Sequence, residues 1–330
     1  MTEALALLGE IRTNLLPNAD ALSEAEVSRL LPQFPGQRIA IRERPLARAT
    51  SPGRAIGVDC DLANHRGAES RAVGTVDAHA VVIGGRVAQS SARVRVVRAL
   101  VKERRPWSHY LTRVGTLELI HNKLGNDAAT ALALAEGHLE LPGDETTLDL
   151  GSICELLLNQ VLTDPRLERR QPPLRTAATC LRWVARVVPP AGEEPPDRIH
   201  LNFRLEQDGL RKVRIEVPTA ADLAGVQHFC EDLAVHDWLL TTFGAALGDV
   251  ARTGPNEDPV GKLAPLLESL AHLWMPGAHS PRRFRRFWDG LEADPGFTAQ
   301  WTAQVGQMRD RMTAATLAAL RSSKISTARW

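Results

Sequence analysis

Alternation of apolar and polar residues predicts a β-rich N-terminal part of the chain. The segments with this pattern are 40–48, 55–63 and 74–100. In each of them apolar and polar residues alternate along the chain, as they do on a strand with one buried face. Gly84 and Gly85 separate two valine-rich runs, and this pair favours a two-residue hairpin because the turn needs positive φ. WSHYL (107–111) and GTLELI (115–120) predict a further pair of strands.

Helical spacing of apolar residues becomes dominant from about residue 126. Residues 146–162 place their large apolar side chains on one helical face. A strand-rich segment follows at 180–217, where Asp208 and Gly209 form a strong hairpin signal. Residues 219–322 return to helical spacing. A further helix is expected earlier in the chain, with Ser23 as its N-cap.

These patterns predict an α+β protein with two parts. A chain of 330 residues is long enough for two hydrophobic cores. We expect a β-rich domain over 1–122, a helical connection and linker over 123–175, and an α+β domain over 176–325. The second domain would hold strands within 180–217 and a mostly helical C-terminal end.

Composition and charge exclude several classes of protein. Lysine and arginine (40) balance aspartate and glutamate (39), so no global field attracts the chain to nucleic acid or an anionic membrane. No two of the four cysteines form a C-x-x-C pair, which argues against a thiolate zinc site. The N-terminal residues lack the basic region of a secretory signal, and no run is apolar enough for a membrane helix. We therefore expect a reduced, cytoplasmic protein without membrane insertion.

The stretch HFCEDLAVHDWLL, residues 228–240, holds the densest group of potential catalytic or metal-binding side chains. On a helix, His228, Asp232 and His236 lie four residues apart on one face. The two histidines are then about 12 Å apart along the helix axis, too far to share one ion. Asp232 and His236 are the feasible pair, and they need ligands from elsewhere in the chain.

Two interpretations of this stretch remain open. In the first, Asp232, His236 and Asp237 form the centre of a metal-dependent hydrolase, and His272 or His279 completes the metal site. In the second, His236 belongs to a buried apolar stripe, and Asp232 fixes the orientation of its ring. The second is better supported by the sequence, because the surrounding positions are apolar. No metal ion or other cofactor is therefore expected.

Two further segments contain candidate binding residues. Trp107 and Tyr110 either anchor a sheet to a helix or stack on an aromatic ligand. Residues 86–105 are strongly basic, with Arg93 and Arg95 on one strand face. That face is either a solvated outer surface or a ribbon that contacts phosphates. The solvated surface is the commoner arrangement, so nucleic-acid binding is not our main expectation.

The segment SPRRFRRFWDGL (280–291) is predicted to form a helix with a buried aromatic stripe. Phe284, Phe287 and Trp288 recur at helical spacing, with arginines at the outward positions. Ser280 is the expected N-cap, and the proline after it fits the first helical position. No phosphate-binding loop of the G-x-x-x-x-G-K-[ST] or G-x-G-x-x-G type occurs in the chain. Nucleotide hydrolysis and dinucleotide binding by the usual routes are therefore not expected.

Several phrases of the sequence, taken together, resemble an uncharacterised actinobacterial protein family. They are GEIRTNLLPN, IGVDCDL, RPWSHYLTR, CEDLAVHDWLLTT and HLWMPGA. The resemblance extends from Gly9 to about Leu320. Members of that family are encoded beside a variant P-loop protein, so the resemblance implies a shared pathway and a P-loop protein as a possible partner. It implies no activity and no catalytic residues.

The sequence favours a non-enzymatic, protein-binding or assembly component of a multi-protein bacterial system. The metal-dependent hydrolase is the alternative, and nucleic-acid contact through residues 86–105 is a third. Five of the seven tryptophans fall in the last hundred residues, namely Trp238, Trp274, Trp288, Trp301 and Trp330. Exposed tryptophans there would favour a protein-binding surface, and buried ones would leave that idea without support.

Overall fold

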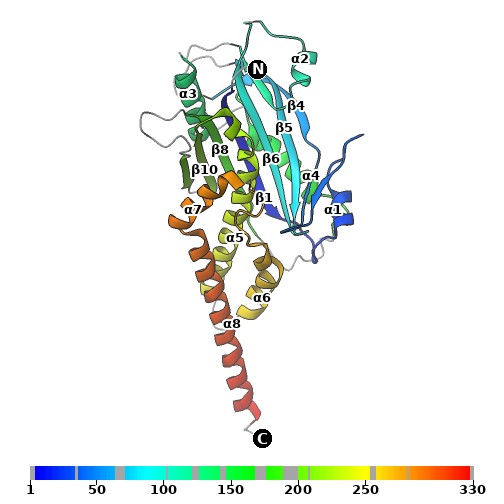
Figure 1. Cartoon of the computed structure of the whole chain (residues 1–330). Coiled ribbons are helices and arrows are strands. Elements are labelled where there is room, and N and C mark those ends of the chain that lie inside the picture. Colours follow the sequence, from blue (N-terminus) through cyan, green and yellow to red (C-terminus); the bar gives the residue numbers. More distant parts are fainter. Residues whose placement is uncertain are drawn as a thin grey trace.

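The computed structural model describes most of the chain, with short gaps. The described residues are 4–33, 36–63, 71–101, 103–120, 126–141, 146–167, 176–188, 200–206, 209–252, 258–280 and 282–327. They form a mixed sheet with helices on both faces (Figure 1). The predicted α+β fold class is confirmed. No helix among these residues has the length and apolar character needed to cross a bilayer.

Among the described residues, ten strands form one sheet: nine follow the order β2-β3-β5-β7-β6-β1-β8-β10-β9, and the tenth, β4, pairs with β5. The strands are β1 (Ala4–Leu15), β2 (Ala40–Arg42), β3 (Arg48–Thr50), β4 (Arg54–Asp61), β5 (Arg71–Ile83), β6 (Val87–Arg98), β7 (Thr116–Leu119), β8 (Thr179–Val187), β9 (His200–Leu205) and β10 (Leu210–Val217). Strand β1 is central, because it pairs antiparallel with β6 on one side and with β8 on the other. Strand β10 runs parallel to β8, and β9 lies at the end of this order.

The two predicted hairpins are present. Gly84 and Gly85 adopt positive φ values of 56° and 63° between β5 and β6. Strands β9 and β10 pair antiparallel, and Gly209 in their connection has φ of 71°. Asp208, the other residue of that hairpin signal, lies outside the described residues. The glycine signals therefore located both reversals of the chain.

Helices cover both faces of the sheet. They are α1 (Glu24–Leu30), α2 (Trp107–Leu111), α3 (Asp127–Glu140), α4 (Leu150–Leu162), α5 (Val226–Arg252), α6 (Pro259–Leu270), α7 (Arg285–Ala293) and α8 (Phe297–Thr327), with three short 3-10 turns at Ala220–Leu223, Ala271–Leu273 and Arg282–Phe284. Helices α3 and α4 pack on one face, and α5 packs on the other with α6, α7 and α8 around it (Figure 1). Ser23 caps α1 as predicted, in a reciprocal capping box with Glu26.

Two hydrophobic cores lie on opposite faces of the one sheet. Successive strand residues point to opposite faces. In β6, Val94 and Val96 are fully buried on the face covered by α3 and α4. In β8, Trp183 is fully buried on the face covered by α5, whereas its neighbour Val184 belongs to the other core. The two cores therefore share a backbone layer, with side chains of the same strands on both sides.

The structure corrects one predicted element. WSHYL, expected as a strand, forms the short helix α2, whose N-cap is Pro106. Tyr110 on this helix is only 2% exposed. Its hydroxyl accepts a hydrogen bond from the backbone N–H of Arg105 at 3.0 Å. A single helical turn places Tyr110 in the core, so tertiary burial decides the conformation of this segment. GTLELI does supply a strand, β7.

The predicted division into domains stays a prediction, and the sheet bears on it directly. Strand β1 lies in the segment 1–122, and its partner β8 lies in the segment 176–325. Helix α4, from the predicted connection over 123–175, packs against β1 and β6. Strands of both proposed domains thus belong to the same sheet, and no break in strand pairing marks the boundary.

Candidate functional site

Helix α5 carries most of the side chains that the sequence marks as candidates. It has 27 residues, and 18 of them are buried. One side packs on β1, β6 and β8, and the other meets α6 and α8. A helix enclosed in this way buries its polar residues together with its apolar ones. The buried candidates Asp232, His236 and Asp237 must therefore find partners in the protein interior, whereas His228 is exposed.

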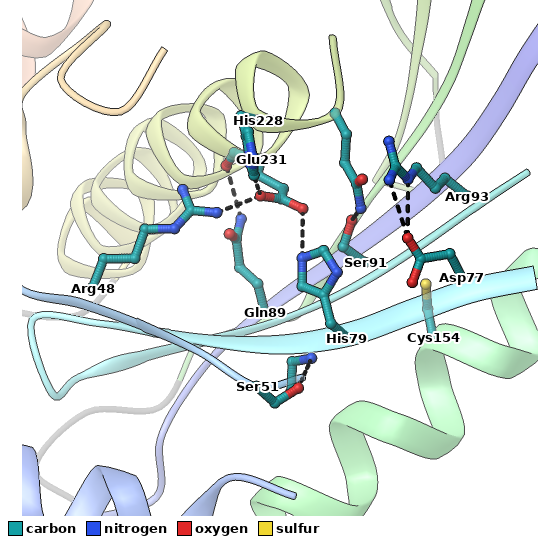
Figure 2. Close-up of polar contacts among 12 residues, drawn as sticks. Arg48, Ser51, Asp77, His79, Gln89, Ser91, Arg93, Cys154, His228 and Glu231 are labelled. Carbon is teal, nitrogen blue, oxygen red and sulfur yellow. Dashed lines mark hydrogen bonds and ion pairs between the residues drawn. The ribbon is translucent and has the colours of Figure 1, made fainter. Parts of the chain in front are cut away.

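Glu231, fully buried on α5, is the centre of a cluster of charged and polar groups (Figure 2). Its carboxylate forms an ion pair with Arg48 of β3. His79 of β5 lies 2.9 Å from one carboxylate oxygen, and His228 lies 3.3 Å from the other. Burial alone would raise the pKa of Glu231, but the charges of His79 and Arg48 lower it well below its usual value. The carboxylate is therefore ionised.

Polar side chains of the sheet complete this contact. Gln89 donates hydrogen bonds to the backbone carbonyl of Glu231 and to Thr13 Oγ1, both at 3.0 Å. Gln227 donates to Ser91 Oγ at 2.9 Å. The bonds at Gln89 and Ser91 join α5 to β6 (Figure 2), and the bond from Gln89 to Thr13 joins β6 to β1. Both oxygens of Glu231 already have partners, so the cluster acts as a clamp between helix and sheet and offers no unengaged base.

His236 uses both of its ring nitrogens inside the protein. Nδ1–H donates to the backbone carbonyl of Asp232 at 2.7 Å, and Nε2 accepts from the backbone N–H of Met275 at 3.1 Å. The rings of Trp274 and Trp288 pack edge-on against it, with centroids 5.1 and 5.3 Å away. This arrangement supports the structural interpretation of His236. Asp232 does fix the ring, but mainly through its carbonyl, since its carboxylate lies 3.7 Å from Nδ1.

The carboxylate of Asp232 has a different partner. Ser280 Oγ donates to it at 2.9 Å and accepts a hydrogen bond from Trp288 Nε1 at 3.1 Å. Burial raises the pKa of Asp232 above its usual value, and His236 and Ser280 oppose that effect. The prediction that Ser280 caps the helix is wrong, because α7 begins after Phe284. Ser280 instead links Asp232 of α5 to the aromatic stripe of α7.

The other proposed metal ligands do not assemble with this group. His279 is 8% exposed, and its Nε2 has no hydrogen-bond partner among the described residues. Burial and the charge of Arg48 lower the pKa of His279 to about 4. Burial and Arg86 lower the pKa of His272. Within the described parts of the chain, no three histidine, cysteine, aspartate or glutamate side chains are placed to hold a metal ion.

Asp237, the next residue after His236 on α5, pairs with Arg211 of β10. Burial raises the pKa of Asp237 to about 6, although Arg211 favours its ionised form. Arg211 also donates to the carbonyl of Gly209 and to Thr241 Oγ1, the latter at 2.5 Å. This buried pair lies at a cavity of about 750 Å³. Elements β9, β10, α5, α7 and α8 all contribute to its walls.

The candidate binding residues near α2 lie mainly in structural contacts. Trp107 is 38% exposed and packs edge-on against Tyr110, with ring centroids 5.8 Å apart. The guanidinium of Arg104 lies 5.1 Å from the centre of the Trp107 ring. With Tyr110 buried, only Trp107 offers a surface, and Arg104 covers part of it. The role as an anchor of the sheet therefore fits Tyr110 well.

Most described arginines of the basic segment 86–105 have partners. Arg93 forms a cross-strand ion pair with Asp77, at 3.1 Å (Figure 2). Arg98 pairs with Asp127, and Arg104 pairs with Asp59. Arg95 is half-buried on the same face as Arg93. These carboxylates offset the positive charge that a phosphate-contacting ribbon would need.

The aromatic residues of the C-terminal part are mainly buried. Phe284, Phe287 and Trp288 form the predicted buried stripe, at 0%, 3% and 6% exposure. Trp238 and Trp301 are also buried, and the half-buried Trp274 stacks on Trp301 with ring centroids 4.5 Å apart. Trp330 lies outside the described residues. The described tryptophans therefore do not supply the exposed protein-binding surface considered from the sequence.

Sequence reasoning missed the residues that make the strongest polar contacts of α5. Arg48 and His79 come from distant strands and carry no local motif. The one available signal was Glu231 itself, a charged residue inside the apolar run FCEDLAV, where burial demands a partner.

Comparison of the chain with known proteins finds no matching family model, no similar curated protein and no similar solved structure.

Proposed function

We propose that this chain is a non-enzymatic, protein-binding component of a multi-protein bacterial system. The observation that carries the proposal is the C-terminal half of α8, which extends as a single helix beyond the rest of the fold (Figure 1). Helix α8 has 31 residues, which corresponds to about 46 Å at 1.5 Å per residue. Phe297, Trp301 and Met308 anchor its first half in the core. We call residues 313–327 the arm.

The arm presents apolar side chains to solvent. From Thr313 to Arg321, every side chain except that of Ala315 is exposed. Leu317 and Leu320 are 49% and 55% exposed and share one helical face. A helix without packing partners gains little stability on its own. A partner that covers this face would bury both leucines and stabilise the arm, in the helix-in-groove mode of recognition.

The proposed partner is the variant P-loop protein that accompanies the family this sequence resembles. The proposed membership of that family supplies the partner, and the arm supplies the surface. The hydrolase alternative has no comparable support, because His236 has both ring nitrogens engaged. Contact with nucleic acid through residues 86–105 also lacks comparable support, because Arg93, Arg98 and Arg104 are paired with carboxylates.

The test is co-expression of the chain with the neighbouring P-loop protein, followed by size-exclusion chromatography and a titration of affinity. We expect a complex that the double variant Leu317→Glu/Leu320→Glu weakens by at least about 100-fold, because burial of each leucine contributes about 1.5–3 kcal/mol. The matched control, Ala318→Glu/Ala319→Glu, adds the same charge to the opposite helical face. It should bind almost as well as the unmodified chain.

Equal loss in both double variants would show that added charge, and not the leucine face, controls binding. Absence of any complex with the unmodified chain would reject the P-loop protein as the partner. Both double variants should keep the melting temperature of the unmodified chain, because the substituted side chains are exposed.

A further inference from the structure

Strand β9 ends the sheet on the side opposite β2. Among the described residues it pairs with β10 alone, from His200 opposite Glu216 to Leu205 opposite Arg211. A strand in this position presents backbone N–H and C=O groups that another strand could pair with. In an antiparallel ladder, residues alternate between those bonded to the partner strand and those whose backbone groups face outward. The register of β9 therefore identifies the residues whose N–H and C=O groups face outward.

The register places three residues of β9 with their backbone groups outward. The N–H of Glu206 donates to the carbonyl of Leu210 at 2.8 Å, which makes those two residues a hydrogen-bonded pair. Every second residue of β9 then bonds to β10, and the intervening ones turn their N–H and C=O to the free side. The outward residues are Leu201, Phe203 and Leu205. No hydrogen bond from another described residue reaches their backbone groups.

The cavity of about 750 Å³ lies directly along this edge. Its β9 wall includes all three outward residues, and helices α7 and α8 form the facing wall. Phe203 packs edge-on against Phe297 at the end of the cavity, with ring centroids 5.7 Å apart. Leu205 remains 65% exposed. The strand edge therefore lies beside a space that is lined by both apolar and polar side chains.

The charges in the cavity limit the kind of ligand. The charges of Arg211 and Asp237 neutralise each other there. Arg211 also donates hydrogen bonds to the carbonyl of Gly209 and to Thr241. The buried part of the cavity thus has no uncompensated charge for a phosphate or a metal ion. The exposed Arg286 and Asp294 lie at the surface of the cavity. The remaining lining offers, together with uncharged amides such as Gln300 and Gln304, backbone donors and acceptors of β9 beside leucine and phenylalanine side chains. An extended peptide satisfies both, because its backbone forms ladder bonds and alternate side chains enter the pocket.

We propose that the groove between β9 and helices α7 and α8 binds an extended peptide segment of a partner protein as an added strand. Its sequence would alternate apolar residues, which enter the cavity, with polar residues, which face solvent. This site is distinct from the arm, whose Leu317 and Leu320 do not line the cavity. The inference does not depend on the partner proposed for the arm.

The experiment presents the full chain with a display library of extended peptides of about seven residues, a little longer than a typical strand. Enriched peptides are then titrated against two matched pairs of variants. The first pair is Gly290→Trp and Gly306→Trp. Both glycines are helical, and an added Cβ would meet nothing within 4 Å at either. Only Gly290 lines the cavity, so only its substitution should weaken peptide binding, by at least tenfold.

The second pair is Leu205→Pro and Leu205→Val. Proline removes an outward N–H but leaves the ladder with β10 intact, because edge strands tolerate proline at such positions. We expect about fivefold weaker binding for Leu205→Pro than for Leu205→Val, the effect of one lost hydrogen bond. Hydrogen exchange provides the direct readout. The amides of Leu201, Phe203 and Leu205 should exchange rapidly in the free chain and become protected with bound peptide.

Three results would overturn the proposal. The first is the absence of enriched peptides that alternate apolar and polar residues. The second is peptide binding that neither Gly290→Trp nor Leu205→Pro weakens relative to its control. The third is protection of the same three amides without peptide at high protein concentration, accompanied by dimer formation, which would make a second copy of the chain the occupant. Loss of the arm interaction would leave all three readouts unchanged.

Discussion

Glu231 shows what a single charged residue requires in a protein interior. Its carboxylate has no exposure to solvent, and Arg48, His79 and His228 replace the lost water. Removing one member of such a group leaves the others buried without compensation, which costs more than the intact group contributes. The cluster therefore makes α5 sensitive to substitutions in strands far from it in sequence.

We predict that Glu231→Gln lowers the free energy of unfolding by about 3–5 kcal/mol, because it leaves Arg48 buried and unpaired. Urea denaturation at neutral pH measures the effect. The control is Glu155→Gln, since the side chain of Glu155 is 56% exposed in its ion pair with Arg12, and we expect a loss of less than about 1 kcal/mol. Adding Arg48→Met to Glu231→Gln should restore part of the lost stability. A double variant less stable than Glu231→Gln would contradict this account.

The half-buried His138 predicts how stability changes in acid. His138 Nε2 lies 3.2 Å from the carbonyl of Gly9, and burial together with Arg182 lowers its pKa to about 4. The ordinary value in an unfolded chain is about 6.5. Because the folded pKa is depressed, protonation favours the unfolded state, so stability is full above pH 6.5 and falls as the pH drops toward 4.

We predict that His138→Gln reduces this acid-dependent loss by about 2–3 kcal/mol between pH 6.5 and pH 4, because the variant has no imidazole to protonate. Unfolding titrations at several pH values give the two slopes. His200→Gln serves as the control, since its side chain is exposed, and it should keep the slope of the unmodified chain. Parallel slopes for His138→Gln and the unmodified chain would rule out His138 as the source.

At this scale the sequence predicts burial better than it predicts partners. The stripe of Phe284, Phe287 and Trp288 was predictable because its helical period is local. The partner of Glu231 was not, because Arg48 is 183 residues away along the chain. Ser280 was misassigned for a related reason. A serine before a helix is a typical cap, and only the folded chain brings it to Asp232.

Individual turns, helices and strands could be predicted where the signal for them lies in neighbouring residues. The glycine hairpins and the Ser23 cap needed only neighbouring residues and were predicted. Strand β1 was not, because its run of apolar residues, ALALL, lacks strict alternation. Leu7 and Leu8 of β1 belong to opposite cores. A strand buried on both faces shows no period of two. Helix α2 was missed because a five-residue segment carries too little periodicity to distinguish a turn of helix from a strand.

The pairing of β1 with β8 depends on a glycine. Gly9 lies opposite Trp183, and a Cβ on Gly9 would come within 2.1 Å of the indole ring. Trp183 is fully buried, so close-packed neighbours oppose a shift of its ring. We predict that Gly9→Ala lowers the free energy of unfolding by about 1–3 kcal/mol, the usual cost of overpacking.

Thermal and urea unfolding of Gly9→Ala provide the measurement, and Gly306→Ala is the matched control. An added Cβ at Gly306 meets nothing within 4 Å in the middle of α8. Its substitution should stabilise the chain by about 0.5–1 kcal/mol through helix propensity. Two alanine variants of equal stability would show that the indole ring tolerates the added methyl group.

The whole molecule is organised by its shared sheet. Strands from 1–122 form one block of the sheet, strands from 176–325 form the other, and the pairing of β1 with β8 joins the two blocks. The two cores use opposite faces of the same strands. Hydrophobic spacing indicated where most strands and helices lie, and composition permitted two domains. Neither contains information on which strands become neighbours, because pairing between distant segments leaves no periodic trace in a single sequence.

From this arrangement we predict one cooperative unfolding transition for the full chain, in which the calorimetric and van't Hoff enthalpies agree. The fragment 1–122 should not fold alone, because it lacks β8 beside β1 and the helix α5 that covers one face. Circular dichroism and dispersion of amide NMR signals test the fragment. Two separate transitions, or a folded fragment, would instead support independent domains.

The central place of β1 has a consequence for synthesis of the protein. Strand β1 is synthesised well before its partner β8, which pairs with it from Leu7 opposite Ala185 and is made more than 150 residues later. At about 5–20 residues per second, the strand waits roughly 10–30 s for that partner. During this interval one side of β1 offers an apolar edge to any nascent chain nearby. Protection of that edge by a chaperone, until β8 emerges, would then decide the yield of native protein.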